Sequence, residues 1–250
     1  MGGDVLLALN LAVFPDCLPE EVVAEIIRGG ADKIKEAGGV IAGGHTVEGP
    51  EPLFGMAVLG VAGRAHLWTK GGAQPGDWLL LTKPLGVGIV TTAAKAEAAD
   101  PTHVAEATRW MSLLNRSACL AARRFAVHAC TDITGFSVLG HACEMACASN
   151  AQLELRFSTL PFVPGAIDYA KQWLFPAGTA NNEKAFRERV HFAPELAEEM
   201  RLLLFTPETS GGLLLAMPPE DASALLALPG APAIWHVGAV SAGEARVCVS

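Results

Sequence analysis

The stretch TDITGFSVLGHACEM (131–145) joins the end of a short predicted strand to the start of a predicted helix. The segment HACTDITG (128–135) is typical of a strand followed by a turn, and apolar residues recur at helical spacing over 136–148. Strands and helices alternate in both directions from this point. We therefore predict an α/β class, in the broad sense that includes α+β folds with mixed sheets.

Upstream of this stretch, VLLALNLAVF (5–14) is predicted to be a buried strand, and it is too short to cross a membrane. A helix is expected from Pro19 to the glycines at 38–39, with Gly29 and Gly30 inside it, where close packing or a kink is expected. The segment VIAGGHTVEGPEP (40–52) is predicted to be a loop. LFGMAVLGVAG (53–63) follows as a second apolar strand, and we place a domain boundary after residue 64.

The second domain, 65–250, is predicted to be a complete α/β domain. Its expected elements, in chain order, are a buried strand at 78–86, one long helix over 102–127, the strand and helix of 128–148, a strand at 152–160, a looser polar stretch at 161–189, a strand at 209–218, a helix at 220–228, and a closing strand pair at 233–240 and 245–249.

The composition excludes several classes of protein. Half of the 250 residues are hydrophobic (51%), which is enough for a well-buried core. The net charge is −8, the basic residues are scattered and Tyr occurs once, so we expect no nucleic-acid partner. The six cysteines show no C-x-x-C spacing, and we interpret them as reduced packing thiols. No membrane-spanning or export segment is predicted, which favours the cytoplasm.

Asp132 is the first candidate for chemistry, because it stands where a strand ends and a helix begins. One interpretation is that its carboxylate caps the helix. The other is that it binds Mg²⁺, since hard cations prefer carboxylate oxygens and often bridge to substrate phosphates. A single acid is too few for such a site, so further carboxylates would be needed from elsewhere.

Other segments leave alternatives open. Gly43, Gly44 and His45 could present backbone N–H groups to an anion, or form a tight turn with a satisfied histidine. The segments TKPLG (82–86), which contains Lys83, and TSGG (209–212) could hold phosphate or be ordinary turns. His141 and Glu144, spaced i to i+3, are interpreted as a solvated or half-buried pair rather than a catalytic dyad.

Five segments taken in order resemble the selenophosphate synthetase family, also called selenide, water dikinase. They are GGHTVEGPEPLFGMAVLG (43–60), PGDWLLLTKPLGVGI (75–89), MSLLN (111–115), TDITGFSVLGHACEM (131–145) and TPETSGGLLLAMP (206–218). The resemblance covers essentially the whole chain.

The resemblance implies a two-domain fold shared with aminoimidazole ribonucleotide synthetase, thiamine monophosphate kinase and a hydrogenase-maturation protein. It implies the conversion of ATP, selenide and water to selenophosphate, AMP and orthophosphate, with Mg²⁺ required. Asp132 would be a metal ligand, and Gly43, Gly44 and His45 would contact the nucleotide across a homodimer formed by the N-terminal domains. Ser137 stands where the family usually has glycine.

The family also carries a reactive Cys or selenocysteine, a Lys and further metal-binding aspartates before the segment that matches Met1-Gly2-Gly3. We therefore expect the sequence to begin inside the first domain, with residues 1–64 as the C-terminal part of an ATP-binding and dimerisation domain. No catalytic residue is then assigned in this chain, and little turnover is expected from it alone. We also expect unpaired sheet edges and exposed apolar surface at VLLALNLAVF (5–14), with aggregation or self-association through that edge.

Two other functions are compatible with these features. The chain could be another ATP-dependent synthetase or kinase of the same superfamily, although TDITGF and TSGGLL together disfavour this. It could also be a non-catalytic nucleotide-binding protein, which would take up Mg-nucleotide without consuming it.

Overall fold

The computed structural model describes residues 1–250 apart from the side chain of Ala65. The chain divides into two compact units, one of Gly2–Leu67 and one of Trp68–Ser250 together with Met1. The predicted boundary after residue 64 lies close to this division. The roles that we assign to the two domains remain predictions.

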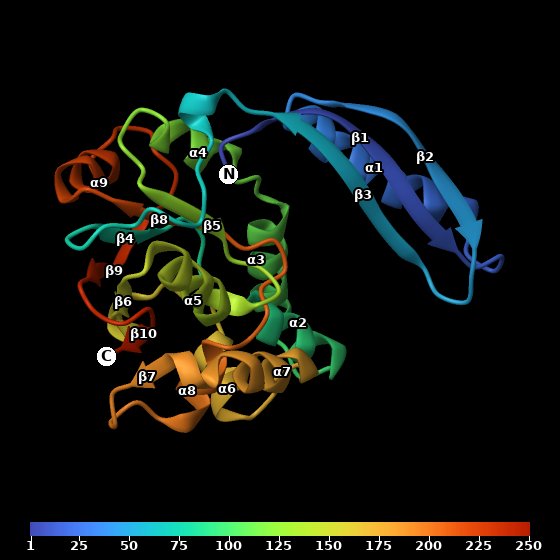
Figure 1. The fold of residues 1–250 in the computed structure, drawn as a ribbon. Coiled ribbons are helices and arrows are strands. Elements are labelled where there is room, and N and C mark those ends of the chain that lie inside the picture. Colours follow the sequence, from blue (N-terminus) through green and yellow to red (C-terminus); the bar gives the residue numbers. More distant parts are fainter. The chain divides into compact units, whose positions relative to one another are not determined.

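The smaller unit is a three-stranded sheet with one helix against it (Figure 1). Its elements are β1 (Asp4–Phe14), α1 (Glu20–Glu36), β2 (Val40–Glu48), β3 (Leu53–Val61) and the 3-10 helix η1 (Arg64–His66). The strand order is β2-β1-β3, with β1 parallel to β2 and antiparallel to β3. The predicted helix and second strand are thus confirmed.

The expectation of a buried first strand with unpaired edges is wrong. β1 is the central strand and is hydrogen-bonded on both sides, so the free edges belong to β2 and β3. Alternate residues of β1 point to opposite faces, as a strand requires. Ala8 and Ala12 are buried, whereas Leu9 and Leu11 are exposed on the face that α1 does not cover, which confirms the expected exposed apolar surface of this segment.

Close packing at the glycines of α1 is confirmed for Gly30. A Cβ atom at this position would lie 2.3 Å from the side chain of Met56 and 2.9 Å from that of Phe54, both on β3. The absence of a side chain therefore lets the helix approach the sheet.

The predicted loop at 40–52 is wrong over most of its length, because Gly43, Gly44 and His45 lie within β2. A Cβ atom at Gly44 would stand 2.3 Å from the backbone oxygen of Asn10 on β1. Gly43 has φ +150°, beside an irregularity in the pairing of β1 with β2. The glycines thus allow the close approach of two strands. In a sequence, a pair of glycines required for this reason looks the same as a pair that forms a turn.

The larger unit is built on a seven-stranded mixed sheet of order β5-β8-β4-β9-β6-β10-β7. Its strands are β4 (Trp78–Leu81), β5 (Ala129–Asp132), β6 (Gln152–Leu155), β7 (Val190–Phe192), β8 (Leu213–Met217), β9 (Trp235–Ser241) and β10 (Val247–Val249). Its α-helices are α2 (Val87–Lys95), α3 (Pro101–Ser112), α4 (Arg116–Ala122), α5 (Ser137–Ser149), α6 (Ala166–Lys171), α7 (Ala177–Phe186), α8 (Glu198–Leu203) and α9 (Pro219–Leu226), and the 3-10 helices are η2 (Phe157–Thr159) and η3 (Arg187–Arg189).

The predicted closing pair is wrong, because β6 lies between β9 and β10. β9 pairs antiparallel with β4 and β6, and β10 runs parallel to β6 and β7. The predicted strand at 152–160 is also shorter than expected and ends at Leu155.

The single long helix expected over 102–127 is broken into α3 and α4. Leu113 is extended (φ −75°, ψ 125°), and its carbonyl oxygen accepts a hydrogen bond from Lys83. Asn115 donates from its side chain to the carbonyl of Gly211. Contacts with distant parts of the chain thus outweigh the helical tendency of the local sequence.

The stretch 161–189, expected to be loose, contains α6 and α7. The sequence of α7, AGTANNEKAF, has no apolar stripe that would reveal a helix. Its buried face is polar: Asn182 donates to the carbonyls of Gly135 and Phe205, and the hydroxyls of Thr179 and Thr206 are hydrogen-bonded.

The core of the larger unit lies on both faces of the sheet. α5 is buried along most of its length against β5, β6 and β10. Among the residues that the structure describes, no helix combines the length and the apolar character needed to cross a bilayer.

Candidate functional site

Asp132 is the last residue of β5 and is held by pairing with Leu213 of β8. Its carboxylate is half-buried, and its Oδ2 atom accepts a hydrogen bond of 3.0 Å from the hydroxyl of Thr134. The residue before α5 is Phe136, and the start of this helix has no side-chain cap. The capping interpretation of Asp132 is therefore wrong.

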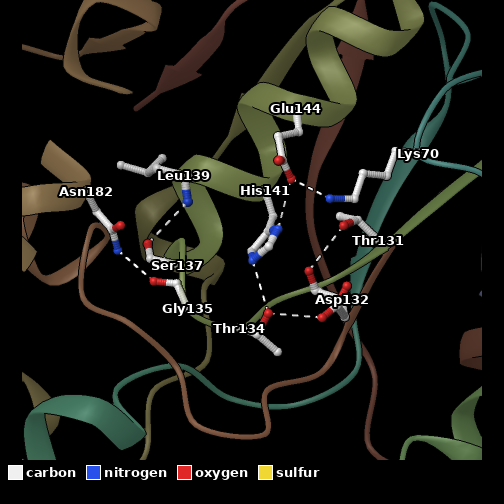
Figure 2. A network of polar contacts seen from close by, with 10 residues as sticks. All are labelled: Lys70, Thr131, Asp132, Thr134, Gly135, Ser137, Leu139, His141, Glu144 and Asn182. Atoms are coloured by element: carbon white, nitrogen blue, oxygen red, sulfur yellow. Dashed lines mark hydrogen bonds and ion pairs between the residues drawn. The ribbon is translucent and has the colours of Figure 1, made fainter. Parts of the chain in front are cut away.

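The turn between β5 and α5 is fixed by contacts from two sides. Asn182 donates to the carbonyl of Gly135 (Figure 2). Ser137 has φ +64° and a buried side chain, and its hydroxyl donates to the carbonyl of Leu204. Glycine adopts this left-handed conformation at little energetic cost, whereas the conformation is unfavourable for serine. The hydrogen bond to Leu204 offsets part of this penalty.

A network of side chains leads away from Asp132 along α5 (Figure 2). The hydroxyl of Thr134 lies 3.2 Å from Nε2 of His141, and Nδ1 of His141 lies 3.1 Å from Oε2 of Glu144. The same carboxylate oxygen accepts from Nζ of Lys70 at 2.5 Å. The interpretation of His141 and Glu144 as a half-buried pair is confirmed: the His141 side chain is 7% exposed and that of Glu144 34%.

Glu144 is held as a carboxylate by this network. Partial burial acts to raise its pKa, but the hydrogen bond and charge of Lys70 and the hydrogen bond from His141 outweigh it and leave the pKa below its usual value. The residue before Lys70 is Thr69, and its carbonyl accepts a hydrogen bond from the backbone N–H of Cys130 on β5. Lys70 thus follows a residue that is bonded to this strand.

Asp132 alone does not make a cation site. Within the part of the chain that the structure describes, no three His, Cys, Asp or Glu residues are gathered closely enough to hold a metal ion. The half-buried carboxylate suits one coordination position of a hard cation such as Mg²⁺. The other positions would be filled by phosphate oxygens, water or ligands outside this cluster.

The segments around Lys83 and 209–212 are packed against each other. Lys83 is buried and donates to the carbonyls of Leu113 and Ser210. The backbone N–H of Leu213 donates to the Thr82 hydroxyl. Their hydrogen-bonding groups are thus engaged within the protein, which favours the structural interpretation over phosphate binding.

Sequence reasoning missed Glu208, which lies in TPETSGG. Its carboxylate is buried and accepts from the backbone N–H groups of Gly86 and Val87 at the start of α2, at 2.6 and 2.9 Å. Burial raises its pKa to about 8, although these hydrogen bonds oppose the shift. Lys70 was missed as well, because 74 residues separate it from Glu144. No local pattern marks either residue.

In the smaller unit, His45 lies on the face of the sheet that α1 leaves open. It is paired with Leu11, which is exposed on the same face. Together with Val47 and Leu53 they line an open hollow of about 410 Å³. Asp132 and His45 thus belong to different units.

The architecture is that of the AIR synthase related proteins. The model of their C-terminal domain matches residues 74–249, and that of their N-terminal domain matches residues 1–62. Solved structures share the fold at low identity. The hydrogenase maturation protein HypE of E. coli has a TM-score of 0.76 at 18% identity, over 99% of this chain and 70% of that one. Thiamine monophosphate kinase of Aquifex aeolicus has a TM-score of 0.71 at 16% identity, over 100% and 74%.

Curated relatives narrow this class. The selenide, water dikinase of Clostridium botulinum (strain Eklund 17B / Type B) is 42% identical over 90% of this chain and 66% of its own length. The enzyme of Trichlorobacter lovleyi is 45% identical over 89% of this chain and 64% of its own length. That of Nitratidesulfovibrio vulgaris (strain DP4) is 42% identical over 96% of this chain and 70% of its own length. The chain belongs to the selenide, water dikinase family, and it spans about two thirds of the length of these relatives.

Proposed function

We propose that the protein takes part in the synthesis of selenophosphate from ATP, selenide and water, with release of AMP and orthophosphate. The observation that carries this proposal is the identity of 42 to 45% with selenide, water dikinases over about nine tenths of the chain. The half-buried Asp132 at the end of β5 is compatible with it.

Asp132 is proposed to bind one Mg²⁺ ion of the metal-nucleotide complex. Mg²⁺ would neutralise charge on the polyphosphate when bound. Asp132 itself would orient the ion through one carboxylate oxygen, and the pairing of β5 with β8 holds the residue in place.

Gly43, Gly44 and His45 are proposed to contact the nucleotide. The place of His45 on the open face of the smaller unit supports this, because its imidazole is accessible there beside a hollow, and Gly43 and Gly44 directly precede it in β2. The imidazole could donate a hydrogen bond to a phosphate or a ribose oxygen.

A homodimer through the smaller unit is proposed on the same grounds. The open face carries exposed apolar side chains on all three strands, among them Leu11, Val47 and Leu53. An apolar surface of this kind is typical of a protein interface. A second copy of the chain would cover it and would bring its own His45 to the contact.

We place the reaction in the cytoplasm. In the part of the chain that the structure describes, Cys130 and Cys143 are thiols buried in the core of the larger unit. Reduced, packed thiols are typical of proteins in a reducing compartment.

The test follows selenophosphate and AMP after anaerobic incubation with Mg-ATP and selenide. The chain is assayed alone and together with the part of the Clostridium botulinum relative that it does not match. Selenide-dependent formation of selenophosphate and AMP in equal amounts is expected in at least one of these reactions. Conversion of ATP to ADP regardless of selenide would indicate another kinase of the superfamily, and binding of Mg-nucleotide without turnover in both reactions would indicate a binding protein.

A further inference from the structure

A continuous series of hydrogen bonds joins the side chains of Glu144, His141, Thr134 and Asp132 (Figure 2). Within this series, the hydroxyl of Thr134 has a single proton. The hydroxyl of Thr134 lies within hydrogen-bond distance of both Asp132 Oδ2 (3.0 Å) and His141 Nε2 (3.2 Å). It can donate to one of them at a time. The direction of this proton therefore decides what the Asp132 carboxylate offers to a cation.

Glu144 decides the direction from the far end of the series. An ionised carboxylate only accepts hydrogen bonds, so its contact with Nδ1 of His141 requires a proton on that nitrogen. In a neutral imidazole Nε2 then carries a lone pair and can accept from the Thr134 hydroxyl in place of Asp132. When a cation binds, the hydroxyl turns to Nε2, and both lone pairs of Oδ2 are left for the cation.

The other tautomer has the opposite effect. With the proton on Nε2, the imidazole donates to the oxygen of Thr134, and the hydroxyl proton points at Asp132 Oδ2. A hydrogen bond to a charged acceptor is strong, and a cation that approaches the same oxygen has to displace it. The two tautomers of His141 thus differ in the ligand that they present at Asp132.

We propose that His141 and Glu144 are positioning residues, which set the Thr134 hydroxyl so that the Asp132 carboxylate is free to bind the cation. This inference rests on the metal role proposed above for Asp132. The two residues do not touch the cation or the nucleotide. They act through a rotating hydroxyl group, and contacts with neighbouring groups hold both His141 and Glu144 in place.

These contacts are with Lys70, Phe136 and the surrounding core. Nζ of Lys70 bonds to the same oxygen of Glu144 that faces His141, so this oxygen is held in place. The ring of Phe136 packs on the imidazole with centroids 5.5 Å apart. His141 itself is buried, which limits the water that could replace the Glu144 contact and stabilise the other tautomer.

The test uses the full 250-residue chain with ¹⁵N-labelled histidine and has two readouts other than activity. The first is the ¹⁵N chemical shifts of His141 at about pH 8.5, two units above the ordinary imidazole pKa. The second is the paramagnetic broadening of signals near residue 132 by Mn²⁺ added alone, which reports even weak cation binding. Both are measured for the wild type, Glu144→Ala, Thr134→Val and the double variant.

We expect the Nδ1–H tautomer of His141 in the wild type and a shift toward Nε2–H in E144A. We expect E144A to weaken Mn²⁺ binding about tenfold, as the loss or gain of one charge-assisted hydrogen bond would. In the T134V background, where no hydroxyl can turn, E144A should have little further effect. An equal effect of E144A in both backgrounds, or an Nε2–H tautomer in the wild type, would overturn the proposal.

Two further variants keep the outcome interpretable. Glu144→Gln, which keeps the size of the side chain, replaces E144A in the same cycle if the latter does not fold. Asp132→Asn separates this inference from the proposed metal role. If D132N binds Mn²⁺ as the wild type does, Asp132 is not a ligand and both fail; if D132N loses binding while E144A keeps it, only the positioning role fails.

Discussion

The ammonium nitrogen of Lys83 lies 2.5 Å from the carbonyl oxygen of Leu113, at the break between α3 and α4. A second bond, to the carbonyl of Ser210, ties the same nitrogen to the segment before β8. One buried side chain thus joins three segments that are far apart in sequence. Its charge is held where water has little access.

The first prediction concerns the pH dependence of stability. Burial lowers the pKa of Lys83 from 10.5 to about 8. Between these values the unfolded chain holds a proton that the folded protein has released, so the contribution of Lys83 to the free energy of unfolding rises with pH over this range. Thermal denaturation of the wild type and Lys83→Met, compared from about pH 7.5 to 10, should show the wild type gaining stability relative to the variant. A difference that is constant with pH would contradict this assignment.

The second prediction concerns Asp132. Asp132→Asn keeps the size of the side chain and an acceptor for Thr134 but removes the charge that a cation requires. We expect the free energy of unfolding to change by no more than about 1 kcal/mol and cation-dependent nucleotide binding to weaken at least about tenfold. Titration calorimetry with Mg²⁺ and a non-hydrolysable ATP analogue measures this. Asp168→Asn, at an exposed site on α6, is the matched control and should leave binding unchanged.

The third prediction concerns the strand contact at Gly44. Gly44→Ala would push a methyl group against the backbone of Asn10, and we expect a loss of about 1 to 3 kcal/mol in the stability of the smaller unit. Gly55→Ala on β3 is the control, because a Cβ atom there would have no neighbour within 4 Å. Hydrogen exchange of β1 and β2 amides distinguishes the two. If both variants exchange alike, the proximity of β1 and β2 is not what requires glycine.

The fourth prediction concerns the open face of the smaller unit. Leu11→Lys places a charge in the centre of the apolar surface and should shift a dimer toward monomer, since burying an unpaired charge is costly. Val22→Lys on α1, also exposed but on the helix, should leave the oligomeric state unchanged. Light scattering coupled to size-exclusion chromatography measures both. A wild type that is monomeric at micromolar concentration contradicts the proposed dimer.

The elements with a clear local signature were predictable from the sequence. The helices α1 and α5 and the strand β8 lie close to their predicted positions. The helices were indicated by a 3.6-residue apolar period and the strand by an apolar run. The strand β2 was mistaken for a loop, because Gly43 and Gly44 remove the side chains by which alternation is recognised. The break at Leu113 was invisible because its cause, Lys83, is 30 residues away.

The same distinction applies to the candidate site. Asp132 could be found because it stands at a strand end inside a recognisable segment, and the i to i+3 spacing of His141 and Glu144 indicated that they could meet. The contact between Lys70 and Glu144 could not be found, because it depends on the edge strand β5 and on the segment that runs beside it. Tertiary contacts of this kind leave no local pattern in a sequence.

The carbonyl of Thr69 bonds to β5 and the ammonium group of Lys70 bonds to Glu144, so two successive residues fasten the start of the larger unit. The effect of lengthening the connecting segment therefore depends on where the extra residues are inserted. A few glycines inserted between residues 63 and 67 would leave both fastenings intact. The same insertion after Thr69 would carry Lys70 out of reach of Glu144 and leave this half-buried carboxylate without the ammonium group that pairs with it.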